Sequence, residues 1–336
     1  MMNYNEFMEY AAGHIKDLLP AEYQSAEVRL ETVQKTSEQY TGLMVRPEGR
    51  DSAPVANMKM FYEQYQATDS IDRVMADIAS VLQMEPPSEI DVNVLKDYDQ
   101  VKDKLFVRLS PVEGNETIMA ESPHTMQADM LMTYHIYIPS KDDGFLSARV
   151  TNQMMEDYSV TPEQLHQDAV ANTPRIFEPK VQSMMEALTG IPEEDPQMMV
   201  VTNSQGSLGA SALFCEGIMD KAAEHMKGNY FVLPSSIHEM LVVPDNGNFN
   251  RADLESMVKQ ANQTVVEPAD KLSDAVYHYD HKDRVFERAD TYEKRVQAKA
   301  AEKGSLLGKL QDKKEQVERN APGIGQNRQR QTGLAM

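Results

Sequence analysis

Residues 230–243 read YFVLPSSIHEMLVV, and this stretch decides the central part of the fold. Two apolar runs, Tyr230–Leu233 and Met240–Val243, flank a polar stretch over 234–239. Short apolar runs bounded by turn residues are typical of buried strands. Pro234 has no N–H to donate to a sheet, so the first strand is expected to end there. The stretch therefore predicts two strands joined by a short polar connection.

The segments around this stretch predict a larger sheet with packed helices. Met198–Val201 is a third strand candidate, and the small-residue run Gly209–Cys215 with Gly217–Met226 is expected to be helical. Thr161-Pro162 opens a helix that should run to about Ile176, with Gln164 completing a capping box. Asn250 caps a further helix, whose apolar face comprises Leu254, Met257, Val258, Ala261 and Val265. Further strands are expected over 105–109, 130–138, 145–151 (after a turn at 142–144), 276–279 and 284–287.

The first part of the chain predicts a small unit of its own. Apolar residues from Tyr4 to Leu19 recur at helical spacing, and Pro20 ends the run. Residues 27–32 alternate as in a half-buried strand, with 42–46 as its partner, and 71–82 form an amphipathic helix. Glu85-Pro86-Pro87-Ser88 is the best linker candidate. The expected fold is α+β: a small N-terminal α+β unit over 1–85, then a main unit over 90–288 with a mixed or antiparallel sheet.

Charge and cysteine content restrict the function. The chain has 33 basic and 53 acidic residues, a net charge of −20, whereas residues 282–336 carry 13 basic and 8 acidic residues. Residues 289–336 are therefore expected to form a mixed-charge tail, partly helical to disordered. Nucleic acid is not expected as a partner, except weakly through this tail, and no membrane segment is present. The single cysteine indicates a reducing compartment, so a cytoplasmic location is expected.

The Gly-containing turn over 202–209 is the first candidate site, with Asn203, Ser204 and Ser207 as its polar residues. A strand–turn–helix of this kind can present backbone N–H groups to an anion. The phosphate-loop pattern requires Lys after the second Gly, where Ala210 stands, and a nucleophile elbow requires Gly where Thr202 stands. The simpler interpretation is a tight structural turn.

The polar connection over 234–239 is the second candidate site, and its candidate residues are Ser235, Ser236, His238 and Glu239. Ser, His and Glu can supply a nucleophile, a base and an orienting group if the fold brings them into a hydrogen-bonded series. A zinc-protease helix would require His at position 242, where Val242 stands. A structural turn with polar contacts is the simpler interpretation, in which His238 links two segments.

Two further sets of residues are interpreted structurally. His278, Asp280, His281 and Asp283 have side chains that can bind metals, yet a solvated turn explains them as well. Cys215 lies in an Ala-rich apolar run, which indicates a small core residue rather than a nucleophile. No catalytic residue, metal or cofactor is therefore expected.

The ordered set of segments resembles a bacterial family catalogued as domain of unknown function 5688, over roughly residues 1–288. The resemblance implies a bacterial protein encoded on mobile or accessory DNA, and it brings no activity or catalytic residue. A more distant likeness to the uncharacterised YtpQ-type family covers the second half. The stretches that carry the main resemblance are residues 3–7, 61–65, 165–173, 201–203 with 209–210, 233–239 with 243–244, and 272–277.

Together these observations favour a cytoplasmic, non-enzymatic interaction or regulatory protein with a protein partner. One alternative is a small-ligand-binding or hydrolytic enzyme that uses the loops 202–209 and 234–239. Another is an acidic mimic of nucleic acid, which requires carboxylates spaced like duplex phosphates. The enzyme alternative requires both loops to converge on one site, with Ser235 or Ser236 about 3 Å from His238.

Overall fold

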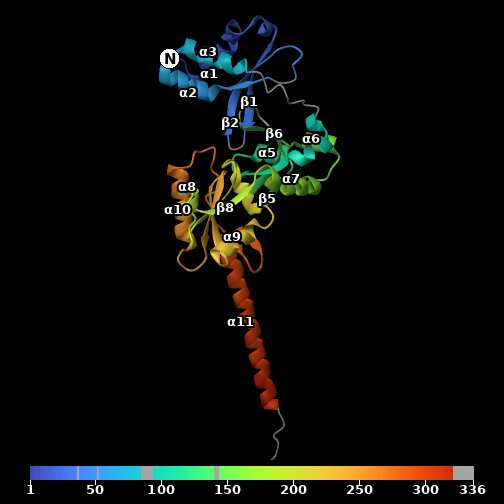
Figure 1. Cartoon of the computed structure of the whole chain (residues 1–336), viewed down its shortest axis with the longest axis vertical. Coiled ribbons are helices and arrows are strands. Elements are labelled where there is room, and N and C mark those ends of the chain that lie inside the picture. Colours follow the sequence, from blue (N-terminus) through green and yellow to red (C-terminus); the bar gives the residue numbers. More distant parts are fainter. Residues whose placement is uncertain (36–37, 51–52, 85–93, 140–143, 321–336) are drawn as a thin grey trace, which may run out of the picture. The chain divides into compact units, whose positions relative to one another are not determined.

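The computed structural model describes residues 1–35, 38–50, 53–84, 94–139 and 144–320 (Figure 1). The chain divides into two compact units, Met1–Arg288 and a second that begins at Ala289. The predicted linker at 85–88, most of the predicted turn at 142–144, and the polar end of the tail after residue 320 lie outside the described residues.

The N-terminal segment forms a three-stranded antiparallel sheet with helices and a core of its own. Phe7, Leu43 and Ile78 are fully buried in that core. Helix α1 ends at His14, and the chain continues as a single 3₁₀ turn. The α-helix is therefore shorter than predicted from the apolar residues that recur up to Leu19. The strand predicted over 27–32 is present, but Leu30, predicted to lie on its buried face, is 40% exposed. The elements are α1 (Tyr4–His14), β1 (Glu27–Lys35), β2 (Glu38–Arg46), β3 (Val55–Asn57), α2 (Met58–Thr68) and α3 (Ile71–Leu82).

A four-stranded sheet follows, with its longest strand, β6 (Met130–Pro139), at the centre. Strand β4 (Leu105–Pro111) pairs with β6 along one edge. Strands β5 (His124–Gln127) and β7 (Phe145–Arg149) pair with successive parts of β6, so they share its other edge. The predicted hairpin between residues 130–138 and 145–151 is therefore formed.

The second large sheet has six strands, and every strand pair in the described part of the chain is antiparallel. The hairpin predicted near residues 276–287 is present as β12 with β13. The spatial order is β13-β12-β10-β11-β9-β8. The strands are β8 (Pro179–Ser183), β9 (Met199–Asn203), β10 (Tyr230–Ser236), β11 (Glu239–Pro244), β12 (Tyr277–Asp280) and β13 (Val285–Arg288).

Helices connect the strands and begin largely where their capping residues predict. The side chain of Thr161 accepts a hydrogen bond from the Gln164 N–H at 3.2 Å, but the Gln164 amide donates to Asp168, so only half of the capping box forms. Asn250 caps α10 in the same way. The helices are α4 (Tyr98–Val101), α5 (Glu116–Glu121), α6 (Asn152–Tyr158), α7 (Pro162–Ile176), α8 (Met184–Thr189), the 3₁₀ helix η5 (Gly209–Phe214), α9 (Ile218–Met226), α10 (Arg251–Thr264) and α11 (Ala289–Asn320).

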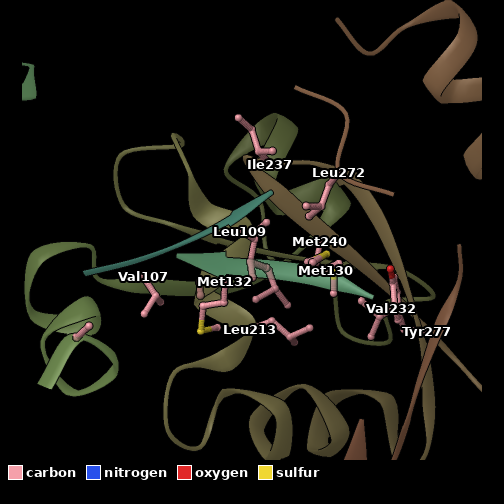
Figure 2. Close-up of a cluster of buried hydrophobic side chains, with 14 of the residues drawn as sticks. Val107, Leu109, Met130, Met132, Leu213, Val232, Ile237, Met240, Leu272 and Tyr277 are labelled. Atoms are coloured by element: carbon pink, nitrogen blue, oxygen red, sulfur yellow. The ribbon is translucent and has the colours of Figure 1, made fainter. Parts of the chain in front are cut away.

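The four-stranded and six-stranded sheets share one hydrophobic core (Figure 2). Leu109 and Met132 come from the first sheet, and Val232 and Met240 from the second. Leu213 of η5 lies in the same cluster. The architecture is therefore α+β, as the sequence predicts.

Two predictions for the part of the chain that contains the four-stranded and six-stranded sheets are wrong. Strand β10 continues through Pro234 to Ser236, with a register irregularity between them. Strand β12 pairs with β10 only as far as Val232, so Pro234 lies where β10 has lost that second partner, and a missing N–H is tolerated there. Met257 of α10 and Val265, which directly follows the helix, are exposed rather than part of a buried face.

Candidate functional site

The two loops singled out by sequence converge. Because β9 pairs with β11, the turn after β9 comes to lie beside the turn before β11. The Thr202 hydroxyl donates to the carbonyl oxygen of His238 at 2.8 Å. The Ala210 N–H donates to the carbonyl oxygen of Ile237 at 3.2 Å. We call loops 202–209 and 234–239, together with Asp270, the His238 junction.

Both ring nitrogens of His238 are occupied in this junction. The Leu208 N–H donates to Nδ1 at 3.1 Å, which makes Nδ1 an acceptor and leaves the proton on Nε2. Nε2 lies 3.3 Å from the Asp270 carboxylate. In a Ser-His-Asp triad one ring nitrogen contacts the carboxylate and the other takes the proton of the nucleophile. Here a backbone N–H fills that second position, so His238 has no nitrogen left to act as a base.

The two serines are also used locally. Ser235 Oγ donates to the Glu239 carboxylate at 3.0 Å, and Ser236 Oγ accepts from the backbone N–H of His238 at 3.0 Å. Neither hydroxyl forms a hydrogen bond with the imidazole ring of His238. The arrangement that the enzyme alternative requires, a serine hydroxyl bonded to the His238 ring, is not what the structure shows.

The 202–209 turn uses its own polar groups in the same manner. Asn203 Oδ1 accepts from the Gln205 N–H at 3.0 Å, and Asn203 Nδ2 donates to the Ser207 carbonyl oxygen at 2.8 Å. The Ser204 N–H donates to the carbonyl oxygen of Glu178 at 2.8 Å. An anion loop requires free backbone N–H groups. The N–H groups of Ser204, Gln205 and Leu208 are bound within the protein instead.

Gly209 allows the loops to approach so closely. A Cβ placed on it would lie 2.5 Å from the carbonyl oxygen of His238 and 2.8 Å from the backbone nitrogen of Asn203. Both atoms belong to the backbone and cannot rotate away. Any other residue at this position would therefore force the two loops apart.

The solvated turn predicted for His278, Asp280, His281 and Asp283 is only partly correct, because His278 and Asp280 are buried. His278 is fully buried and its Nε2 lies 3.0 Å from an Asp245 carboxylate oxygen, whereas the partly exposed ring of His281 lies 3.8 Å from Asp220. Across the described ranges, three or more His, Cys, Asp or Glu side chains do not gather as a metal would require. Burial raises the pKa of the Cys215 thiol to about 12, which keeps it protonated and unreactive.

Sequence reasoning missed an acidic cleft on the main body. It has a volume of about 710 Å³, and Glu113, Glu116, Asp129 and Asp274 are among its lining residues. The Tyr277 hydroxyl donates to Asp129 at 2.6 Å from a point 148 residues further along the chain. Only the fold brings these residues together, so no local sequence signal could have found the cleft. Asp270 was missed for the same reason.

The fold and the His238 junction define an α+β protein whose candidate polar site is closed by its own hydrogen bonds. The chain belongs to a family of unknown function (DUF5688), whose model matches residues 4–281. No curated protein and no solved structure matches the chain. Within the described residues, no helix combines the length and the apolar character that a bilayer crossing requires.

Proposed function

We propose that this protein acts without catalysis, as an interaction or regulatory protein that binds a partner protein. The closure of the His238 junction carries this proposal. A catalytic His needs a nitrogen that can exchange a proton with a reacting group, whereas both nitrogens of His238 join segments of the protein. The junction therefore supports a structural role.

An exposed apolar surface on and after α8 supports partner binding. Met185, Leu188 and Ile191 are 50%, 77% and 64% exposed within seven residues of chain. Concentrated exposed apolar side chains mark interaction sites more often than scattered ones do. Exposed Glu193 and Glu194 follow directly. We call residues 185–194 the α8 surface, and its chemistry fits a partner with an apolar face beside basic residues.

Affinity purification from the native host, with quantitative mass spectrometry, tests the proposal. The double variant Leu188→Asp/Ile191→Asp should lose a partner that the wild-type protein retains. Val265→Asp is the matched control, because Val265 is 79% exposed at the end of another helix. If the double variant retains every protein that the wild type retains, the α8 surface is not the binding site.

The alternative functions each have a decisive outcome. An esterase, phosphatase or nuclease activity that disappears in a stably folded His238→Ala variant would replace our proposal with the enzyme alternative. Salt-resistant competition with duplex DNA for a DNA-binding protein would support the acidic mimic. The link to mobile or accessory DNA and the cytoplasmic location rest on the resemblance and the single cysteine, and the genomic neighbourhood tests the first of these.

A further inference from the structure

The four-stranded sheet has a second face that does not contribute to the core of Figure 2. Residues paired across a sheet point to the same face, and alternate residues along a strand point to opposite faces. Arg108 is paired with Thr133, and His135 with Arg149. These residues alternate with the core residues Leu109, Met132 and Tyr134, so they lie on the opposite face. We call Arg108, Ser110, Thr133, His135 and Arg149 the basic face.

The basic face holds buried polar atoms without partners. In the part of the chain that the structure describes, Nε of Arg108, Nε of Arg149, Nδ1 of His135 and Oγ of Ser110 make no hydrogen bond and are shielded from solvent. Ser110 is only 1% exposed and His135 only 4%. Native proteins pair nearly all of their buried polar groups, because leaving one unpaired costs free energy. Four such atoms on one sheet face therefore require an explanation.

In the described part of the chain, the two arginines of this face have carboxylates near them but no close ion pair, although the protein as a whole is acidic. Arg149 lies 3.9 Å from Glu121, which is a long ion pair. The described residues place no carboxylate within 4.0 Å of Arg108. Burial lowers the pKa of both guanidinium groups, whereas the Asp270 carboxylate acts in the opposite direction on Arg108 and Glu121 does so on Arg149. Arg remains protonated in proteins. The face thus keeps two positive charges close to His135.

The unpartnered groups can all act as hydrogen-bond donors. Burial, together with the charges of Arg108 and Arg149, lowers the pKa of His135 to about 3, so its ring is neutral at pH 7. Its Nε2 lies 3.0 Å from the Thr133 hydroxyl. When that hydroxyl donates to Nε2, the ring proton is on Nδ1, which becomes a donor. Two guanidinium N–H groups, an imidazole N–H and a hydroxyl then lack only an acceptor.

We propose that the basic face binds a small oxyanion, a phosphate or a carboxylate, between Arg108, His135 and Arg149. Arg is the side chain best suited to such groups, because its planar fork donates parallel hydrogen bonds to two oxygens. The ligand is small because the donors are buried, and it would reach them at Arg149, whose side chain is 21% exposed. The inference is independent of the α8 surface and of the proposed partner.

Thermal unfolding of the full chain tests the proposal, with inorganic phosphate and succinate as probes at ionic strength held constant with NaCl. A ligand that binds only the folded state raises the melting temperature in a concentration-dependent way. At least one probe should raise it by a few degrees and saturate. Arg108→Met and Arg149→Met should each abolish that rise. Arg29→Met is the matched control, because Arg29 is exposed and paired with Glu27, and it should keep the full rise.

A second readout separates a binding role from a structural one. Without any oxyanion, Arg108→Met and Arg149→Met should melt no lower than wild type, because each removes a buried Nε–H without a partner and Arg149 loses only its 3.9 Å pair with Glu121. Circular dichroism establishes that each variant is folded, and the more exposed Arg149 carries the test if the Arg108 variant is not. The source of the ligand follows from which probe acts, phosphate or succinate. If neither probe acts, or if the rise persists in both Met variants, the proposal is wrong.

Discussion

Nε2 of His238 lies 3.3 Å from a carboxylate oxygen of Asp270, while the opposite ring nitrogen accepts the Leu208 N–H. The backbone strengthens the same link, because the Ile237 N–H donates to the carbonyl oxygen of Asp270 at 2.8 Å. One imidazole therefore joins three segments that are distant in sequence. The His238 ring therefore holds these segments together and is expected to stabilise the folded state.

His238→Ala should lower the free energy of unfolding by about 1–3 kcal/mol, because it leaves the Leu208 N–H and the Asp270 carboxylate without their partner. Urea unfolding measures the change. His225→Ala is the control, since His225 is exposed on α9, and it should unfold at the wild-type urea concentration. A His238→Ala variant as stable as wild type would show that the ring does not fasten the loops.

Gly209→Ala should destabilise the protein by about 1–3 kcal/mol, the usual cost of overpacking. The added Cβ meets the backbone of His238 and Asn203, which must move apart. Gly13→Ala is the contrasting variant, because nothing lies within 4 Å of a Cβ there and the residue is in helix α1. It should stabilise the protein by about 0.5–1 kcal/mol, as Ala does in helices. Equal effects from the two variants would contradict the close approach.

The buried His135 should make stability depend on pH. Its folded pKa of about 3 lies below the 6.5 of a free imidazole, so the unfolded chain binds a proton that the folded chain does not bind. As pH falls from 6.5 towards 3, this group therefore lowers the free energy of unfolding, by up to about 1.4 kcal/mol per unit. Urea unfolding of wild type and His135→Leu between pH 7 and 4.5, in buffers without oxyanions, isolates the contribution. As pH falls, the free energy of unfolding of wild type should decrease relative to that of His135→Leu. A difference between the two free energies that stays constant with pH would contradict this prediction.

Removal of the residues after Arg288 should leave the first unit folded. The chain divides into compact units at this point, and the described side chains of the second unit are mostly exposed beyond its first turns. Little buried apolar surface is then lost. The shortened protein should melt within a few degrees of the full chain by calorimetry. Loss of a cooperative transition would show that the tail contributes to the fold of the body.

Much of the body could be predicted because local chemistry specifies it. Thr161 and Asn250 begin helices through their own side chains, and the strand predicted over 276–279 forms one half of a hairpin. Each signal lies within the segment it describes. The α+β class follows from the succession of such segments.

The errors came where a partner elsewhere in the fold decides the outcome. Pro234 lies inside a strand because β12 no longer pairs with β10 at that point, and Met257 is exposed although its spacing places it beside buried Leu254. The candidate loops were found because their residue types are unusual. Asp270 and the basic face could not be found in this way. A single Asp or Arg gives no sequence signal, and these residues come together only in the folded protein.

The hydroxyl of Tyr277 and the guanidinium of Arg288 both bind Asp129, across 148 and 159 residues of chain. A ribosome must therefore release almost the whole body before the turn at Asp129 finds these partners. Strand β10 likewise lacks its neighbour β12 until the chain beyond α10 has been synthesised. Contacts that close such long loops form slowly and leave apolar strands uncovered meanwhile. The nascent chain is therefore expected to expose apolar surface, of the kind that chaperones bind, until its last strands emerge.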